Sequence, residues 1–340
     1  MTTRWNTGPY LRRYMALVED RALARYLVAR AVPVEPFDDL DASGMWKAHE
    51  QGMEEYLELV EADRVPGPAK PNLMDLKVAI ARDMLTSCRF CAHDCKVDRR
   101  KGRGYCGVGP ARIASRFMHM GEEEVLVPSY TIFFAGCNLR CVFCQNHDIS
   151  TRPDAGAEVA APEMAETLGI ARARGARNIN WVGGDPAPDL HYVLEVLARS
   201  EANIAQVWNS NMYLSGEAMS LLDGAMDVHL TDLKFGNDDC AFRLCGARDY
   251  MDVVTRNHMV ASSQCEVIVR HLMLPGHLEC CTIPVLDWLS ERLPDAPVNI
   301  MAQYRPEHRA WDFAELRKRL PGSDHIRAVE HARRKGLMLI

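Results

Sequence analysis

Apolar residues follow two different spacings along this chain, and the spacing changes near residue 130. In the first part they recur three or four positions apart, as at Tyr10, Tyr14 and Leu17. This spacing is typical of amphipathic helices. The sequence therefore predicts a helical N-terminal extension over residues 1–87, interrupted by the Pro- and Gly-rich stretch 65–71.

From residue 131 onward, short β-branched or aromatic runs alternate with longer stretches of helical pattern, such as Pro162–Arg174 and Leu190–Arg199. The six predicted strands are Thr131–Ala135, Asn178–Val182, Ala205–Trp208, Val228–Thr231, Val267–Leu274 and Val298–Gln303. Strands that alternate with helices form right-handed βαβ units and a parallel sheet. We therefore predict an α/β fold, a partial (β/α)6 TIM-like barrel over residues 126–306, followed by a helical segment over 307–340. The chemistry of such a barrel lies at the carboxyl ends of its strands.

The composition is that of a globular protein, except for its cysteines. Of 340 residues, 48% are hydrophobic and 25% charged, which excludes disordered and fibrous classes. The net charge of −6 gives no reason to expect nucleic acid or an anionic membrane as a partner. Twelve residues are cysteine, and seven of them lie between Cys88 and Cys144. This clustering points to metal ligands in a reducing compartment.

The ends and apolar runs of the chain agree with a cytoplasmic location. The N-terminal residues Met1–Trp5 lack the charged and apolar regions of a secretory signal. No run reaches the roughly 18–20 apolar residues that a membrane span needs. We therefore expect a cytoplasmic protein whose cysteines are reduced.

A first group of cysteines follows directly on the first predicted strand. Cys137, Cys141 and Cys144 have the spacing C-x3-C-x2-C. Thiolates are the ligands of iron–sulfur clusters, and this close spacing lets one loop surround a cluster. Three ligands on a [4Fe–4S] cluster leave one iron open to bind another group. The alternative is a set of buried structural cysteines or half of a zinc site.

The block from Thr131 to Asn146 resembles the cluster loop of the radical S-adenosylmethionine (SAM) superfamily, with Phe143 at the aromatic position before the third cysteine. More narrowly, it is similar to proteins related to the pyruvate formate-lyase activating enzyme. The resemblance implies a [4Fe–4S] cluster whose open iron is chelated by SAM, and a one-electron reductant such as flavodoxin or ferredoxin. It also implies reductive cleavage of SAM to a 5′-deoxyadenosyl radical that abstracts hydrogen from a protein or peptide, as in an activating enzyme.

The same resemblance assigns cofactor contacts to residues that follow the predicted strands. Gly183-Gly184-Asp185 stands where the family often has Gly-Gly-Glu, whose backbone meets the SAM amino group. Asn209-Ser210-Asn211 is similar to a SAM-contacting segment, with Asn209 in place of an acidic residue. Lys234 of Asp232-Leu233-Lys234 is expected at the methionyl carboxylate, and Arg270 or His271 at the ribose or carboxylate. Taken singly, each motif is more often a turn or a surface charge pair, and it is their joint placement after successive predicted strands that favours a cofactor site.

A second group, Cys88, Cys91, Cys95 and Cys106, has the spacing C-x2-C-x3-C-x10-C. Four thiolates close the coordination of zinc or bind an iron–sulfur cluster, so we predict a metal-binding insert over residues 88–125, either structural or an electron relay. His93 could replace one of these cysteines as a metal ligand, but we prefer to interpret it as an exposed histidine of the loop. The basic run 99–103 has two interpretations, a phosphate-binding site or a solvated loop around this metal, and we prefer the loop.

Five cysteines have no four-ligand pattern. Cys265 begins an apolar strand and is expected in the core. Cys240 and Cys245 are substrate-contacting thiols, part of a third metal site, or packing residues, with packing preferred. Cys280 and Cys281 stay unassigned.

Two further functions remain open at this point. One is radical modification of a small molecule. The other is a non-enzymatic iron–sulfur electron carrier, which predicts four-cysteine sites only, whereas Cys137, Cys141 and Cys144 have no fourth cysteine near them in the sequence.

Overall fold

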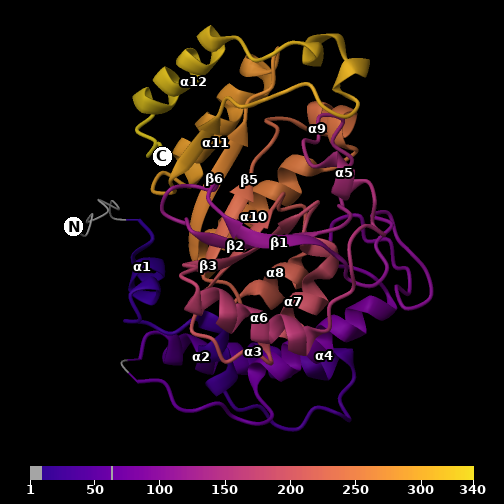
Figure 1. The fold of residues 1–340 in the computed structure, drawn as a ribbon, viewed down its shortest axis with the longest axis vertical. Helices are drawn as coiled ribbons and strands as arrows, with labels where there is room; N and C mark the ends of the chain where they lie inside the picture. The colour runs from indigo at the N-terminus through magenta and orange to yellow at the C-terminus, as the bar shows by residue number, and fades with distance from the viewer. Residues whose placement is uncertain (1–9, 63) are drawn as a thin grey trace.

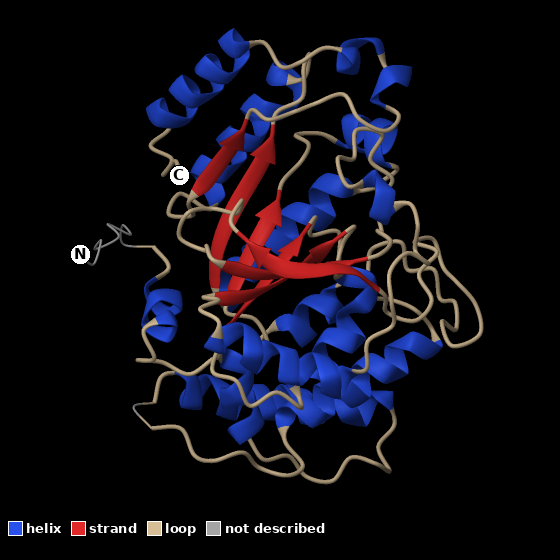
Figure 2. Ribbon diagram, viewed as in Figure 1, coloured by secondary structure: helices blue, strands red, loops and turns tan. Residues whose placement is uncertain are grey.

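In the computed structural model, which describes residues 10–62 and 64–340, a curved sheet crosses the centre of the molecule (Figure 2). Within these residues the sheet has seven strands, which are β1 (Ile113–His119), β2 (Ser129–Phe134), β3 (Asn178–Gly183), β4 (Ala205–Ser210), β5 (Val228–Asp232), β6 (Glu266–Leu272) and β7 (Val298–Met301). They lie side by side in chain order. Strands β2 to β7 are parallel, and β1 pairs antiparallel with β2.

The predicted fold class is confirmed, and each of the six predicted strands overlaps one of the strands β2 to β7. Strand β1 was not predicted, because it lies in the stretch 88–125 that we assigned to metal binding. It is an edge strand whose side chains are mostly half-exposed, and Phe117 is 44% exposed. An edge strand of this kind lacks the continuous apolar run that marks the buried parallel strands.

The helices surround the sheet in two groups (Figure 1). The helices are α1 (Arg12–Val18), α2 (Arg25–Ala31), α3 (Ala42–Val60), α4 (Leu73–Thr86), α5 (His147–Ser150), α6 (Ala161–Ala173), α7 (Leu190–Leu197), α8 (Gly216–Leu222), α9 (Asp238–Cys245), α10 (Tyr250–Gln264), α11 (Ile283–Arg292) and α12 (Gly322–Arg334). Helices α6, α7, α8, α10 and α11 connect successive parallel strands, as βαβ units require.

The N-terminal helices form a layer beyond the connecting helices. Helix α4 packs against α2, α3 and α7, and it begins with a capping box between Asn72 and Asp75. The predicted helical N-terminus is therefore present from Arg12 onward. Our interpretation that Met1–Trp5 carry no secretory signal falls outside the described residues. None of the described helices is long and apolar enough to cross a bilayer.

The strand register brings the ends of neighbouring strands to one edge of the sheet. Gly183 pairs with Phe134, two residues before Gly136, and Asp232 pairs with Arg270. Because parallel strands all end at the same edge, residues far apart in sequence converge there. The cysteine loop that follows β2 lies at this edge.

Candidate active site at the carboxyl edge of the sheet

Residues 136–146 form the loop that carries Cys137, Cys141 and Cys144, which we call the cluster loop. Gly136 begins it with φ 88°, a left-handed conformation that favours glycine. A Cβ at this position would also lie 2.4 Å from Val108 Cγ2. The loop is held by backbone bonds from the amides of Arg140 and Val142 to the carbonyls of Cys245 and Leu244, at 3.0 and 2.9 Å. Helix α9 therefore supports the cluster loop through its last residues.

The three sulfurs of the cluster loop face one cavity and have polar neighbours. The Leu139 amide donates to Cys137 Sγ at 3.3 Å, and Asn211 Nδ2 lies 3.8 Å from the same sulfur. The Ser150 hydroxyl lies 3.2 Å from Cys144 Sγ. Donors that point at sulfur favour thiolates, so these residues fit metal ligands better than apolar packing.

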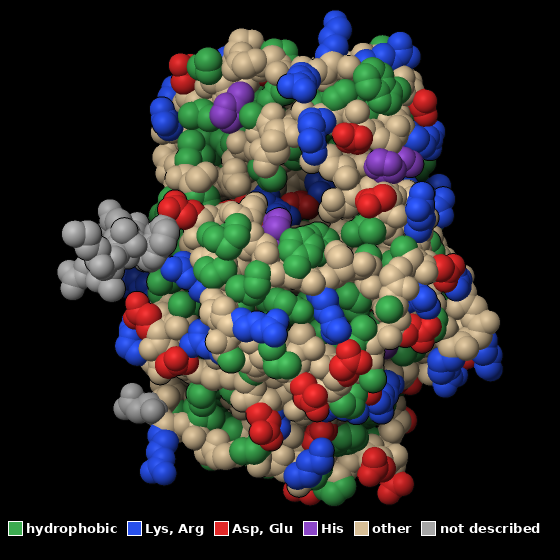
Figure 3. All heavy atoms as spheres, in the orientation of Figure 1, with side chains coloured by type: hydrophobic (Ala, Val, Ile, Leu, Met, Phe, Trp, Pro, Cys, Tyr) green, Lys and Arg blue, Asp and Glu red, His purple; other side chains and the backbone are tan. Residues whose placement is uncertain are grey.

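The predicted cofactor contacts come together at the same cavity. The cavity is lined by the three cluster-loop cysteines and by Gly183, Gly184, Asp185, Asn209, Ser210, Asp232, Lys234 and Arg270. Their contacts with a cofactor stay a prediction. The space-filling view shows a hollow near the centre of one face, with acidic and basic side chains in its depth (Figure 3).

His271 is the one predicted contact that does not line this cavity. It is buried, with Nδ1 2.7 Å from the Leu233 carbonyl and Nε2 2.9 Å from Thr282 Oγ1. Both ring nitrogens are thus engaged by the protein. His271 ties the connection after β5 to the one after β6, and Arg270 is the residue of this pair that reaches the cavity.

Gly183 and Gly184 allow two backbone segments to approach closely. A Cβ on Gly184 would lie 1.9 Å from the Gly136 carbonyl oxygen. A Cβ on Gly183 would lie 2.2 Å from the Phe134 amide nitrogen, and its φ is 134°. Only glycine fits these contacts, which press the end of β3 against the start of the cluster loop.

The Asp185 carboxylate joins the ends of β3 and β4. It is buried and accepts hydrogen bonds from the Ala187 amide at 2.9 Å, the Asn211 amide at 2.8 Å and the Ser210 hydroxyl at 3.1 Å. Burial raises the pKa of Asp185 to about 6, and these hydrogen bonds oppose the rise. The side chain therefore shapes the cavity wall, and Gly183 and Gly184 beside it line the same cavity.

Asp232, Lys234 and Arg270 form a charged network on the opposite wall. Lys234 Nζ lies 2.6 Å from Asp232 Oδ2, and Arg270 Nε lies 3.0 Å from Oδ1. Although burial raises it, the two cations together lower the pKa of Asp232 to about 2. Arg270 also donates to Asn209 Oδ1. The network holds two cations in the cavity, as a ligand carboxylate requires.

Glu122 is a partner of this network that the sequence did not indicate. Its carboxylate lies 3.5 Å from Arg270 Nη1 and is nearly buried, and burial raises its pKa. The neighbouring Glu123 accepts from Asn299 Nδ2 at 3.0 Å, on β7. In the sequence these residues belong to the acidic run 122–124, which has the pattern of a solvent-exposed loop. Only the curvature of the sheet brings them to β6 and β7.

Cys245, for which packing was preferred, lies beside the cluster loop. Its buried side chain hydrogen-bonds to Cys141, and this contact and burial raise the pKa of the Cys141 thiol. A sulfur this close to Cys141 is poorly placed to bind a different iron of the same cluster. Cys245 is therefore better placed to hydrogen-bond with Cys141 than to act as a fourth ligand.

The second cysteine group, Cys88, Cys91, Cys95 and Cys106, lies within the insert 88–125. Burial raises the pKa of Cys88 to about 11, and the nearby sulfurs of Cys95 and Cys106 add to the rise. A Cβ on Gly104 would lie 2.4 Å from Cys95 Sγ. The structure thus places Cys95 and Cys106 near Cys88, and metal binding by this group stays a prediction.

Residues 100–103 of the basic run are exposed, as expected for a solvated loop, but the expectations for Arg99 and His93 are wrong. Arg99 is not solvated: it is buried, donates to the Gly109 and Pro188 carbonyls, and lies 3.8 Å from the buried Asp189. His93 is not an exposed loop residue, because Nε2 lies 2.7 Å from the Asn138 carbonyl and its ring stacks on Tyr105 with centroids 3.7 Å apart. Both residues bind the insert to the barrel.

A third group combines cysteines that the sequence left apart. The ligand atoms of Cys240, His277, Cys280 and Cys281 all lie within 4.8 Å of one another. Cys240 packs against the core, as preferred, but its place in this group also keeps the alternative of a third metal site open. A signal was present in the stretch 277–281, where three ligand-type side chains occur within five residues, but Cys240 comes from a separate helix. Cys265, by contrast, is buried as expected.

Comparisons with known proteins bear on residues 131–289, which match the family model for the radical SAM superfamily. The chain is 43% identical over 340 residues to "Uncharacterized protein MJ0674" of Methanocaldococcus jannaschii, covering 97% of this chain and 99% of that protein. It is 26% identical over 198 residues to the 7-carboxy-7-deazaguanine synthase of Methanothermobacter thermautotrophicus, covering 54% of this chain and 80% of that protein.

Among solved structures, similarity extends to Streptococcus suis SuiB bound to S-adenosylmethionine, with TM-score 0.47 and 17% identity over 60% of this chain. The chain spans about half the length of that protein, 47%. It is also similar to methylornithine synthase (PylB), with TM-score 0.45 and 14% identity, covering 96% of this chain and 77% of the other.

Proposed function

Because the chain belongs to the radical SAM superfamily, we propose that it cleaves SAM reductively and that the resulting 5′-deoxyadenosyl radical abstracts hydrogen from a protein or peptide. The observation that carries this proposal is the single cavity shared by Cys137, Cys141 and Cys144 and by the polar ends of four parallel strands. A cavity lined by three cysteines and two partly buried cations suits a cluster with an open iron and a zwitterionic ligand.

Different residues of the cavity would bind the cluster and SAM. Cys137, Cys141 and Cys144 would hold a [4Fe–4S] cluster, which when bound supplies the electron and the open iron for SAM cleavage. The backbone carbonyl oxygens at Gly183 and Gly184 would accept hydrogen bonds from the SAM amino group. Lys234, fixed by Asp232, offers its ammonium group to the methionyl carboxylate.

Two substrate classes remain candidates. The protein or peptide substrate rests on the resemblance of the cluster loop to proteins related to the pyruvate formate-lyase activating enzyme. Radical modification of a small molecule is favoured by the similarity to a 7-carboxy-7-deazaguanine synthase over 54% of this chain. Incubating the reduced enzyme with SAM and either a protein fraction or a small-molecule extract of cells grown in deuterated medium, then following deuterium transfer into 5′-deoxyadenosine, separates the two classes.

We propose partners and a location that follow from the same chemistry. A flavodoxin or ferredoxin supplies the electron. The Cys88, Cys91, Cys95 and Cys106 group binds zinc or a second iron–sulfur cluster. Twelve cysteines without a disulfide among the described residues agree with a reducing, cytoplasmic location.

The test is anaerobic reconstitution with iron and sulfide, followed by dithionite and SAM. We expect 5′-deoxyadenosine from the wild type and none from Cys141→Ala. Cys265→Ala is the matched control, because Cys265 is a buried cysteine outside the three groups. Wild-type enzyme with a spectroscopically intact [4Fe–4S] cluster that yields no 5′-deoxyadenosine would overturn the proposal and favour an electron carrier.

A further inference from the structure

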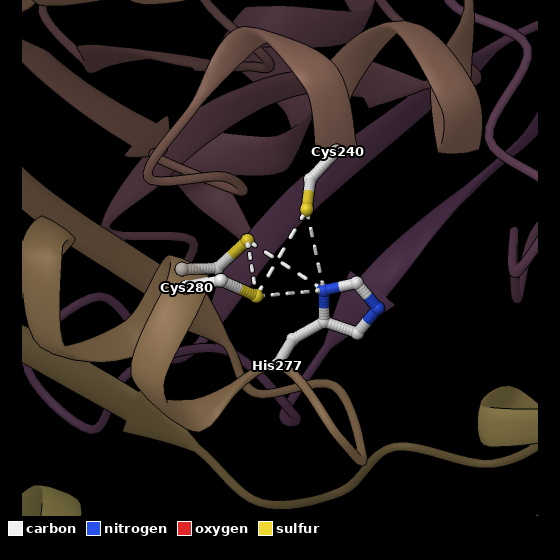
Figure 4. Close-up of side chains that lie close together, drawn as sticks. Cys240, His277 and Cys280 are labelled. Carbon is white, nitrogen blue, oxygen red and sulfur yellow. Dashed lines mark hydrogen bonds between the residues drawn. The ribbon is translucent and has the colours of Figure 1, made fainter.

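We infer that Cys240, His277, Cys280 and Cys281 form a structural zinc site, separate from the cluster loop and independent of the proposed radical chemistry. The four side chains converge from helix α9 and from η2 (Leu278–Thr282), a single π-helical turn before α11 (Figure 4). Within the described part of the chain, this is the group whose ligand atoms all lie within 4.8 Å of one another.

The distances between the ligand atoms fit one tetrahedral ion. His277 Nδ1 lies 3.5, 3.4 and 3.7 Å from the sulfurs of Cys240, Cys280 and Cys281. Cys280 Sγ lies 3.9 Å from the sulfurs of both other cysteines. Around tetrahedral zinc, with its ordinary bond lengths, two sulfurs are about 3.8 Å apart and a sulfur and a nitrogen about 3.6 Å apart. The four atoms thus form the corners of a site of the right size.

The local sequence explains how adjacent cysteines can both point at one ion. In a regular helix consecutive side chains diverge by about a quarter turn, whereas π-helical turns are wider and occur mostly at functional sites. Asn237 adds a second constraint, since its Oδ1 caps α9 at the Cys240 amide (2.8 Å) and its Nδ2 donates to the Cys280 carbonyl (2.6 Å). One side chain therefore sets the spacing of the two elements that carry the ligands.

A disulfide and an iron–sulfur cluster fit the same atoms less well. A disulfide joins sulfurs about 2.05 Å apart, whereas the sulfur pairs here are 3.9 Å apart. A cluster separates its cysteine sulfurs by several bonds, which calls for a wider spacing than a single ion. Three thiolates with one imidazole are a common ligand set of closed, structural zinc sites.

The surroundings of His277 combine burial with charged partners. The ring is buried, its Nδ1 faces the sulfurs, and its Nε2 lies 3.4 Å from Arg243 Nη2 and 3.9 Å from a carboxylate oxygen of Glu315. Metal-bound histidines usually present their second nitrogen to a carboxylate or carbonyl. Arg243 binds Glu315 at 2.6 Å and also contacts Cys240, so it places a positive charge beside three thiolates.

Zinc at this position would link the segment that follows β5 to the segment that follows β6, and both strands end at the cavity. Cys240 follows β5 and its Asp232, and His277 follows β6 and its Arg270. The other end of α9 accepts the two backbone bonds from the cluster loop. The ion would therefore fix α9, and through it the cluster loop, to the rest of the barrel.

The experiment is metal analysis of the full-length protein, purified anaerobically from cells grown with zinc. We expect Cys240→Ser/Cys281→Ser to contain one zinc per chain less than the wild type. The matched control, Cys265→Ser, should lose none. Equal zinc in the double variant and the wild type would overturn the site, as would a loss of iron in place of zinc, or a Cys240–Cys280 disulfide found by mass spectrometry in the wild type.

A second pair of variants guards against misfolding. His277→Cys keeps four ligands and should retain the zinc, whereas His277→Ala should lose it or bind it at least tenfold more weakly. Replacing the zinc by Co²⁺ should give the thiolate charge-transfer and tetrahedral d–d absorption bands in the wild type and in His277→Cys. Because these readouts do not require SAM cleavage, they are unaffected if the proposed function is wrong.

Discussion

Lys234 and Asp232 are two residues apart, and their side chains turn into the same cavity with Nζ 2.6 Å from Oδ2. The other oxygen of Asp232 is 3.0 Å from Arg270 Nε on the neighbouring strand. Burial lowers the pKa of Lys234, but Asp232 and Cys141 together raise it by more, so the ammonium group stays charged. The carboxylate thus fixes a cation in place before any ligand arrives, which lowers the cost of ordering it on binding.

The first prediction concerns this fixed cation. Lys234→Met should weaken SAM binding about 10- to 100-fold, since a hydrogen bond to a charged group contributes about 1.5–3 kcal/mol. The Asp232–Arg270 pair and the iron content should be unchanged. Equilibrium dialysis of SAM against the anaerobically reconstituted protein measures the effect. Lys318→Met is the control, because Lys318 is exposed. Unchanged affinity in Lys234→Met with full iron would contradict the assignment.

The sequence predicted the parallel part of the fold because buried parallel strands have a strong local pattern. Runs such as Val267–Val269 are β-branched, continuous and apolar, and all three of these residues are buried. Residues that follow such strands share one edge, so the wall formed by Asp185, Asn209 and Asp232 could be anticipated. The structure adds that Arg270 reaches this wall and His271 does not.

What the sequence did not predict depends on contacts between distant segments. Strand β1 is half-exposed and has no periodic apolar run, and Glu122 meets Arg270 only because the sheet curves. The zinc ligands Cys240 and Cys280 are forty residues apart and come together through a turn that no local pattern indicates. Arg99 belongs to a basic run that resembles a surface loop, but its pairing with Asp189 buries it.

The second prediction concerns the contact between β3 and the cluster loop. Gly184→Ala would place a methyl group 1.9 Å from the Gly136 carbonyl oxygen, so one of the two segments must move. We expect the free energy of unfolding to fall by about 1–3 kcal/mol and the iron content of the cluster loop to fall with it. Denaturant unfolding and iron analysis measure the two effects.

Gly169→Ala is the control for that substitution. Gly169 lies within α6, and a Cβ there meets nothing within 4 Å. Alanine should therefore stabilise the helix by about 0.5–1 kcal/mol and leave the iron content unchanged. If both variants behaved alike, the close approach at Gly184 would have no role in holding the loop.

The third prediction concerns the second cysteine group. Cys91→Ser/Cys106→Ser should lose the metal of one complete centre, as zinc or as iron, because the remaining two thiolates cannot hold either. Tyr105 precedes Cys106, and its ring stacks on His93 and lies under Arg140 of the cluster loop at 4.1 Å. This short path suits an electron relay.

The reductant distinguishes the relay from a structural role. With a relay, the double variant should form 5′-deoxyadenosine more slowly than the wild type when reduced flavodoxin is the donor, and at the wild-type rate with dithionite. Equal slowing with both donors would indicate a structural centre. Metal content equal to that of the wild type would show that these cysteines bind no metal.

The fourth prediction concerns a buried cation outside the candidate site. Lys77 on α4 is fully buried, and its Nζ lies 2.6 Å from Nε2 of His49 on α3. Burial lowers the pKa of Lys77 to about 7 and, with the Lys77 charge, that of His49 to about 2, while Asp223 nearby opposes the shift of Lys77. Both groups therefore bind a proton less tightly in the folded state than in the unfolded chain.

The sign of the pH dependence follows from this difference. Between pH 7 and about 10 the unfolded chain holds the Lys77 proton and the folded protein does not, so the free energy of unfolding should rise with pH, by at most about 5 kcal/mol. Lys77→Met should remove this rise and increase the stability at pH 6–7, because it no longer buries a charge. Urea unfolding at several pH values, with the exposed Lys47→Met as control, tests this. A rise as steep in Lys77→Met as in the wild type would show that Lys77 is not the group that titrates.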